Sequence, residues 1–84
     1  MVFCFMRVYI LQSMKTGRFY CGQTEDLNDR LHRHNSGQNK STFYGIPWEL
    51  KWQLQMENRS EAMKMEKKIK ARGIARFLAD RNIR

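Results

Sequence analysis

The chain has 84 residues, of which 42% are hydrophobic and 12% aromatic. This length and composition predict one small folded domain and exclude a collagen-like or intrinsically disordered chain. Sixteen Lys and Arg residues against eight Asp and Glu residues give a net charge of +8. A surplus of this size on a small domain indicates a polyanionic partner, most often a nucleic acid. The alternatives are a solubilising charged surface or a basic, ribosome-associated protein without activity.

Two cysteines, Cys4 and Cys21, are too few for a disulfide scaffold or a zinc site. Both lie in apolar segments, so we interpret them as small core residues in a reducing compartment. The apolar N-terminal stretch is interrupted by Arg7, is too short to span a bilayer and lacks a signal-peptide pattern. We therefore expect a soluble, cytoplasmic protein that does not associate with membranes.

The first eleven residues alternate with apolar side chains on both sides, which predicts a central strand covered on both faces. Residues 12–17 predict a turn, and residues 18–23 predict a second strand that completes a hairpin. We expect the hairpin loop to have two residues, Met14 and Lys15.

This loop sets the register of the predicted hairpin. It places Tyr9 opposite Tyr20 and Val8 opposite Cys21, so the two tyrosines become neighbours on one sheet face. In the same register Cys4 lies too far along the strand from Cys21 for a disulfide bond.

A helix should follow the hairpin, with Thr24 as its N-cap and its end near Asn35, before Gly37. Its apolar stripe is narrow, and Arg30 and His34 flank that stripe at helical spacing. The helix should therefore carry two polar side chains at the border of its buried face.

Residues 37–47 predict a polar loop that contains Lys40 and Thr42. Residues 48–57 alternate strictly between apolar and polar side chains, which predicts a strand with one buried and one exposed face. The aromatic side chains of this strand are expected to be core residues rather than stacking platforms.

A second helix is predicted from a capping box at Asn58 and Glu61 to Arg72, with Gly73 ending it and a short last helix following. Its expected inward stripe consists of Ala62, Met63, Glu66 and Ile69, so one carboxylate falls among apolar neighbours. From Arg59 onward there are nine basic and three acidic residues, so the charge surplus is concentrated at this end.

The predicted element order is strand, strand, helix, strand, helix, short helix, over one domain that spans residues 1–84. The smallest fold consistent with this order is α+β, with a small three-stranded antiparallel or mixed sheet flanked by helices.

Four polar residues are placed unusually in this pattern: Tyr9, Tyr20, Arg30 and Glu66. Taken singly, each has an ordinary structural explanation as a packed tyrosine or half of an ion pair. Converging where the sheet meets both helices, they suit phosphodiester hydrolysis. A carboxylate can hold a divalent metal, arginine can stabilise a charged transition state, and tyrosine can transfer a proton.

The segment Arg7-Val8-Tyr9, followed eleven positions later by Tyr20-Cys21-Gly22, resembles the paired motif of the GIY-YIG nuclease superfamily. The resemblance covers residues 7–72 and is closest to small stand-alone bacterial members related to the nuclease module of the excision-repair endonuclease. It continues through Arg30-Leu31, His34-Asn35-Ser36-Gly37, Lys40-Ser41-Thr42, Pro47-Trp48, Arg59-Ser60-Glu61-Ala62 and Glu66.

The resemblance implies a role for each of five residues. Tyr9 would be the general base or the activator of the attacking water, and Tyr20 would line the site. Arg30 would stabilise the scissile phosphate, and His34 would hydrogen-bond the tyrosine or the phosphate. Glu66 would hold one divalent metal, Mg²⁺ or Mn²⁺. The implied function is a metal-dependent endonuclease that hydrolyses DNA phosphodiester bonds, in DNA repair or recombination.

The candidate nucleic-acid contacts are Arg7, Lys40, Thr42, Lys67 and Lys70. Arg7 replaces the first glycine of the paired motif and puts a charge beside the expected active face, where it aids phosphate binding or lies at the rim. The expected partners are duplex or branched DNA and other repair proteins, and the expected state is a monomer or a weak dimer. The competing hypothesis is a non-catalytic, basic nucleic-acid-binding module.

Overall fold

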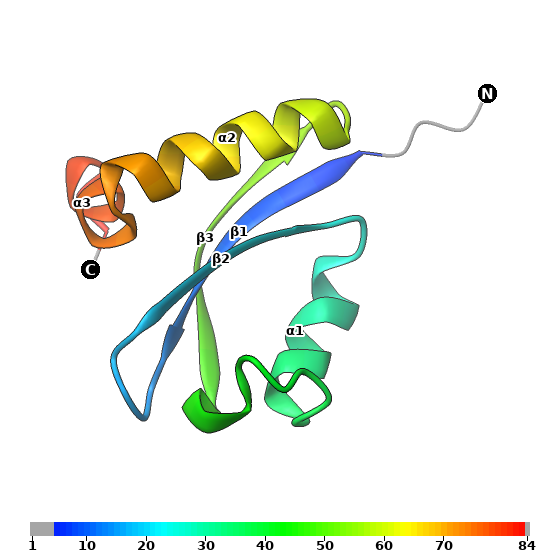
Figure 1. The fold of residues 1–84 in the computed structure, drawn as a ribbon, viewed down its shortest axis with the longest axis vertical. Helices are drawn as coiled ribbons and strands as arrows, with labels where there is room; N and C mark the ends of the chain where they lie inside the picture. Colours follow the sequence, from blue (N-terminus) through cyan, green and yellow to red (C-terminus); the bar gives the residue numbers. More distant parts are fainter. Residues whose placement is uncertain (1–4, 84) are drawn as a thin grey trace.

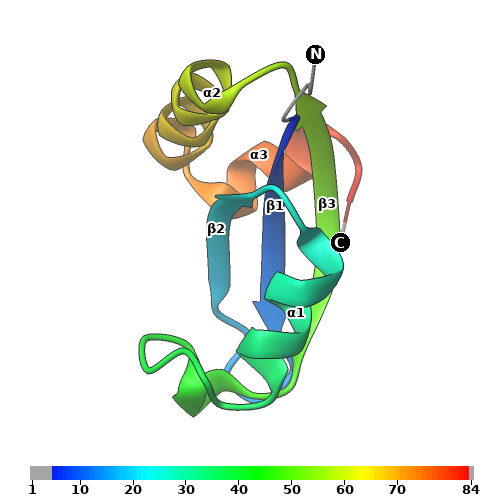
Figure 2. The same cartoon turned by 90° about the vertical axis from the view of Figure 1, so that its right-hand side faces the viewer.

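The computed structural model describes residues 5–83. They form a three-stranded antiparallel sheet with α-helices on both faces (Figure 1). The strands are β1 (Met6–Ser13), β2 (Phe19–Thr24) and β3 (Trp48–Met56), in the spatial order β2-β1-β3 (Figure 2). The helices are α1 (Leu27–Asn35), α2 (Arg59–Arg72) and α3 (Ile74–Asp80), and a 3₁₀ turn, η1 (Phe43–Gly45), precedes β3. The predicted α+β class and element order are confirmed.

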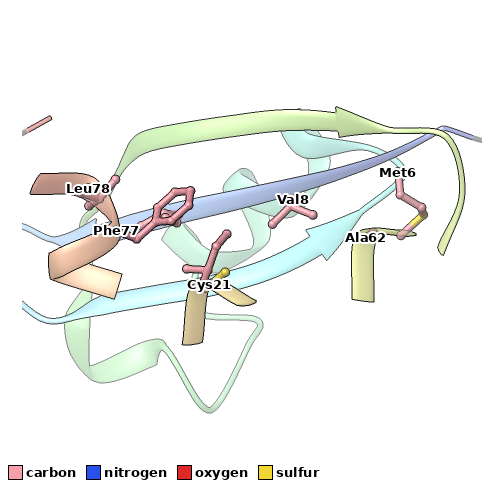
Figure 3. Close-up of a cluster of buried hydrophobic side chains, with 8 residues drawn as sticks. Met6, Val8, Cys21, Ala62, Phe77 and Leu78 are labelled. Atoms are coloured by element: carbon pink, nitrogen blue, oxygen red, sulfur yellow. The ribbon is translucent and has the colours of Figure 1, made fainter. Parts of the chain in front are cut away.

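The central strand β1 contributes to a separate core on each face of the sheet. On one face, Met6, Val8 and Ile10 pack against side chains of α2 and α3 (Figure 3). On the other face, Tyr9 and Leu11 pack with residues of α1 and the start of β3. All five side chains are buried, because α2–α3 and α1 lie on opposite sides of the sheet.

The predicted register of the first hairpin is wrong by two residues. Tyr9 pairs with Gly22 and Ile10 pairs with Cys21, because the loop runs from residue 14 to residue 18 rather than over two residues. Ser13 holds this longer loop, since its hydroxyl accepts hydrogen bonds from the backbone N–H groups of residues 15 and 16. A register shift of two residues keeps each side chain on the same face of the sheet, so Tyr9 and Tyr20 still lie on one face.

Strand β3 departs from the predicted single buried face. Its register with β1 shifts between Ile10, which pairs with Trp52, and Leu11, which pairs with Leu50, so Lys51 is an extra residue in the strand. The bulge reverses the alternation: Trp48 and Leu50 pack in the core beneath α1, whereas Trp52 packs on the α2–α3 core.

The helix caps agree with the sequence in two of three cases. Asn58 caps α2, accepting a hydrogen bond from the backbone N–H of Glu61, and Gly73 ends the helix with a φ of 95°. Thr24 was expected to cap α1, but Asp26 does so, accepting from Asp29 N at 3.0 Å. The helix therefore begins at Leu27, three residues beyond the predicted cap.

The buried stripe of α2 is rotated from the predicted one. Ala62 and Ile69 are fully buried and Met65 packs against the same core, whereas Met63 is 45% exposed. Met65 and not Met63 continues the stripe, because Ala62, Met65 and Ile69 follow one another at three- and four-residue steps. Glu66 borders this stripe, with its side chain 20% exposed.

Cys21 is a buried free thiol, as expected of a core residue, while Cys4 lies outside the described residues. Across residues 5–83 no helix has the length and apolar character needed to cross a membrane.

Two substitutions on α2 test which of its side chains form the buried stripe. Ile69→Ala should lower the free energy of unfolding by about 2–5 kcal/mol, because it leaves a cavity in a fully packed site. Met63→Ala should change it by less than about 0.5 kcal/mol, because that side chain is exposed. Urea unfolding measures both, and equal losses would contradict the assigned stripe.

Candidate active site

Two tyrosines and a histidine meet on the sheet face that α1 covers. The ring centroids of Tyr9 and Tyr20 lie 6.2 Å apart, and the His34 ring lies 4.9 Å from Tyr20 in an edge-on arrangement. Tyr9 comes from β1, Tyr20 from β2 and His34 from the last turn of α1. Tyr9 and His34 are fully buried, while Tyr20 is partly exposed on the edge strand.

Gly22 makes room for the Tyr9 phenol. It lies directly opposite Tyr9, and a Cβ at this position would lie 2.8 Å from Tyr9 Oη and 3.0 Å from Cε1 of Tyr20. Any side chain here would displace the hydroxyl group that the site is built around. The last glycine of the Tyr-Cys-Gly motif is therefore required by packing against the tyrosine of the neighbouring strand.

A chain of buried hydrogen bonds starts at the Tyr9 hydroxyl. Tyr9 Oη lies 3.1 Å from His34 Nε2, and His34 Nδ1 lies 2.7 Å from Thr42 Oγ1. The carbonyl oxygen of Asn39, 3.4 Å from Thr42 Oγ1, can accept the Thr42 hydroxyl proton, and we therefore assign the tautomer in which Nδ1–H of His34 donates to Thr42 Oγ1. His34 Nε2 then carries the free lone pair and accepts the proton of the Tyr9 hydroxyl.

The loop that carries Thr42 is clamped to the end of α1. Asn35 accepts from Trp48 N at 2.6 Å and donates to Trp48 O at 3.1 Å. The Trp48 indole N–H donates to Thr42 O at 2.8 Å, and its ring meets Tyr20 edge-on at 6.4 Å. These contacts hold the Thr42 hydroxyl against His34, so the ring of His34 has one orientation.

Burial and Arg30 set the protonation of the site. Burial raises the pKa of Tyr9 well above its ordinary value, and the neighbouring Tyr20 raises it further. The Arg30 guanidinium opposes this, lowering the pKa of Tyr9 by its charge and by hydrogen bonding. Burial, followed by the charge of Arg30, lowers the pKa of His34. His34 is therefore neutral near pH 7 and able to accept a proton.

Glu66 approaches the site from the other layer. Its helix α2 packs on the opposite sheet face from Tyr9, and its carboxylate lies 3.7 Å from Lys70 Nζ. Burial, followed by the charge of the nearby Glu66 carboxylate, raises the pKa of the Cys21 thiol to about 11. Cys21 follows Tyr20 on the edge strand β2, so Glu66 and Tyr20 flank the same stretch of β2 from opposite faces.

The structure thus brings together four of the five expected catalytic residues, Tyr9, Tyr20, Arg30 and His34, and places the fifth, Glu66, across β2. Residues 5–83 contain no group of three or more His, Cys, Asp or Glu side chains that could hold a metal ion. Glu66 would supply one carboxylate to such a cation, and water could fill other coordination positions. This donor set fits Mg²⁺, which binds hard oxygen ligands and retains several waters.

The expected nucleic-acid contacts fall into different environments. Lys40, Lys67 and Lys70 are exposed, as a phosphate contact requires. Arg7 lies two residues before Tyr9 on the same face and donates to Gln53 and Gln55 at 3.1 and 3.3 Å.

Thr42 differs from its expected role as a DNA contact. It is 1% exposed, and its hydroxyl is engaged by His34, so it has no surface to offer to DNA. Its position is that of a support for His34.

Sequence reasoning assigned no function to Gly22, Asn35 or Trp48. A lone glycine inside a strand signals a close approach by another group, so Gly22 could have been found. Asn35 and Trp48 are thirteen positions apart and meet only because the loop folds back, which no local pattern reveals.

The fold and the site together define a class of small α+β domain, in which one β-hairpin presents two tyrosines to the arginine and histidine of the next helix. Residues 5–75 match the model of the GIY-YIG catalytic domain. The chain therefore belongs to the GIY-YIG family of nucleases, as its resemblance predicted.

Two relatives are named UPF0213 protein, a name that states no activity. The protein from Vibrio campbellii is 38% identical over 64 residues, which cover 75% of this chain and 61% of the relative. The protein from Staphylococcus aureus strain Mu3 is 41% identical over 64 residues, covering 75% of this chain and 77% of the relative. No solved structure matches the chain.

The lowered pKa of His34 predicts a pH-dependent stability. Above its unfolded pKa of about 6.5 the residue is neutral in both states, and below it the unfolded chain binds the proton first. The free energy of unfolding should therefore fall as the pH drops below about 6.5 towards the lowered folded value. His34→Gln should flatten this fall in urea titrations. His32→Gln, at an exposed position of the same helix, should not, and identical profiles for both variants would contradict the assignment.

Proposed function

We propose that this protein is a divalent-metal-dependent endonuclease that hydrolyses DNA phosphodiester bonds. The observation that carries the proposal is the buried chain from Tyr9 through His34 to Thr42, with Arg30 beside the phenol. A packing tyrosine needs one hydrogen-bond partner, whereas the Tyr9 oxygen has a neutral histidine at 3.1 Å and a nearby arginine whose charge lowers the pKa of the phenol. Family membership and the net charge of +8 support a nucleic-acid substrate.

Proton transfer along this chain activates the attacking water. Tyr9 Oη passes its proton to His34 Nε2, and Thr42 holds the ring so that this nitrogen faces the phenol. The charge of Arg30 stabilises the resulting phenolate, which can accept a proton from water. Burial raises the pKa of Tyr9 and lowers the pKa of His34, and both shifts oppose this transfer; the charge of Arg30 favours it by lowering the pKa of Tyr9.

Arg30 and Tyr20 form the part of the site that meets the substrate. Both are partly exposed, whereas Tyr9 and His34 lie behind them. The guanidinium of Arg30 can hold two phosphate oxygens and stabilise the extra charge of the transition state. Tyr20 is partly exposed, and its ring centroid lies 6.2 Å from that of Tyr9, so it can position the water or the phosphate.

Glu66 would hold the divalent cation at β2. The cation supplies Lewis-acid stabilisation of phosphate charge and a more acidic water. Two points support this assignment: the chain belongs to the GIY-YIG family, and Glu66 is the one carboxylate that the resemblance assigns to the metal. A role in DNA repair rests on the resemblance alone.

Cleavage of supercoiled plasmid tests the activity. With Mg²⁺ or Mn²⁺ the protein should convert supercoiled DNA to nicked circles, and EDTA should abolish the reaction. Glu66→Gln should lower the nicking rate at least about 100-fold while leaving folding and DNA binding unchanged. Glu61→Gln removes a carboxylate from the same helix, at a position paired with Lys64, and should remain active.

Retained nicking by Glu66→Gln would overturn the metal assignment. DNA binding without nicking of plasmid or branched DNA, under any metal, would favour the non-catalytic binding module.

Tyr9→Phe tests the proton chain. Removing the hydroxyl should lower the nicking rate about 10²–10⁴-fold, the usual contribution of a general base. It should also cost about 1–3 kcal/mol of stability, because His34 Nε2 loses its buried partner. Tyr44→Phe, at an exposed phenol, is the matched control. Unchanged turnover in Tyr9→Phe would mean that this tyrosine only packs.

A further inference from the structure

Two cavities flank Arg30, and they differ in charge. The first has a volume of about 360 Å³ and lies between the C-terminal half of α1 and the loop that follows. It is lined by Arg30, Arg33, Gln38, Asn39 and Lys40. Three of these side chains are cationic, two are amides and none is a carboxylate. We call it the Lys40 cavity.

The second cavity, of about 410 Å³, lies toward the start of α2 and shares Arg30 and Arg33 with the first. Its lining adds one cation, Arg59, but also three carboxylates, Glu25, Asp26 and Asp29. These acids offset its cations. A polyanion held at Arg30 is therefore attracted toward the Lys40 cavity and gains little on the other side.

Hydrogen bonds hold the loop that carries Lys40. Asn39 Oδ1 accepts hydrogen bonds from Ser41 N at 3.0 Å and Ser41 Oγ at 2.7 Å, which forms a tight turn around Lys40. Two residues on, Thr42 is held by His34. The Lys40 backbone is thus tied to the same histidine as Tyr9, so binding in this cavity costs little loop ordering.

Arg33 is available to a ligand despite its ion pair. It contacts Asp29 at 2.9 Å, but both side chains are about half exposed, at 54% and 49%, and an exposed pair of this kind is weak. A phosphate can replace or share this contact, since the guanidinium has five donors.

We propose that the Lys40 cavity is a second phosphate subsite, which binds the backbone phosphodiester next to the one that Arg30 contacts. Lys40 supplies a point charge, Arg33 a forked donor, and Gln38 and Asn39 amide groups. This inference rests on the proposed function, because it requires a nucleic-acid strand at Arg30. The subsite would make binding of the nucleic-acid strand asymmetric, with the stronger phosphate contact on one side of the scissile bond.

The salt dependence of DNA binding tests the subsite. Binding of a fluorescein-labelled DNA oligonucleotide without a terminal phosphate is followed by anisotropy in EDTA, so that no cleavage occurs. Lys40→Gln and Arg33→Gln should each weaken binding and reduce the slope of log K against log salt by about 0.7–0.9, the loss of one phosphate contact. Arg59→Gln, in the second cavity, and Arg76→Gln, on α3, remove the same charge elsewhere and should leave the slope unchanged.

The outcomes separate this inference from the proposed function. An unchanged slope for Lys40→Gln, in a protein that still nicks plasmid, would overturn the subsite and leave the nuclease standing. Equal losses in all four variants would also overturn it, since they indicate a diffuse field. A Lys40-dependent preference for an oligonucleotide with a 5′-phosphate would overturn the assignment to a backbone phosphodiester. Absence of metal-dependent nicking by the wild type would refute the nuclease, whatever the slopes.

Discussion

The site depends on one constraint, the burial of the Tyr9 hydroxyl over Gly22 and against His34. The glycine is needed because a Cβ would lie 2.8 Å from the phenol oxygen. The histidine is needed because a buried hydroxyl requires a partner, and burial in turn keeps that histidine neutral. Thr42 follows as the group that satisfies the other ring nitrogen. A single buried oxygen thus sets the residue types at three further positions.

Hydrogen bonds around the same histidine hold the loop between α1 and β3. A loop of polar residues has little apolar surface to bury, and here hydrogen bonds hold it: Asn35 clamps Trp48, and the Trp48 indole holds the Thr42 carbonyl. The loop therefore connects the buried phenol to the exposed cation Lys40 through the hydrogen bonds of His34 and Thr42. Glu66 lies on the other layer, so the edge strand β2 is where both layers can meet one substrate.

Errors in the sequence prediction follow the range of the interactions involved. The register of the first hairpin differs by two residues from the predicted one, yet Tyr9 and Tyr20 share a face as predicted, because a shift of two preserves the alternation of a strand. The bulge at Lys51 changes the alternation by one and so moved Trp48 and Leu50 to the other core. Their regular pattern in the sequence contains no sign of this, since the bulge is made by pairing with β1.

Four features could be predicted from the sequence: the α+β element order, the central strand, the cap and end of α2, and the common sheet face of Tyr9 and Tyr20. They depend on period, turn chemistry and capping within short segments. The sequence resemblance also identified the family. Tertiary packing, in contrast, buried Thr42 against His34 and placed Met65 rather than Met63 in the core. It alone decided that Glu66 approaches β2 from the opposite layer. Each of these features depends on how elements far apart in the chain pack against one another. That packing determines which side chains are buried and which stay accessible to solvent.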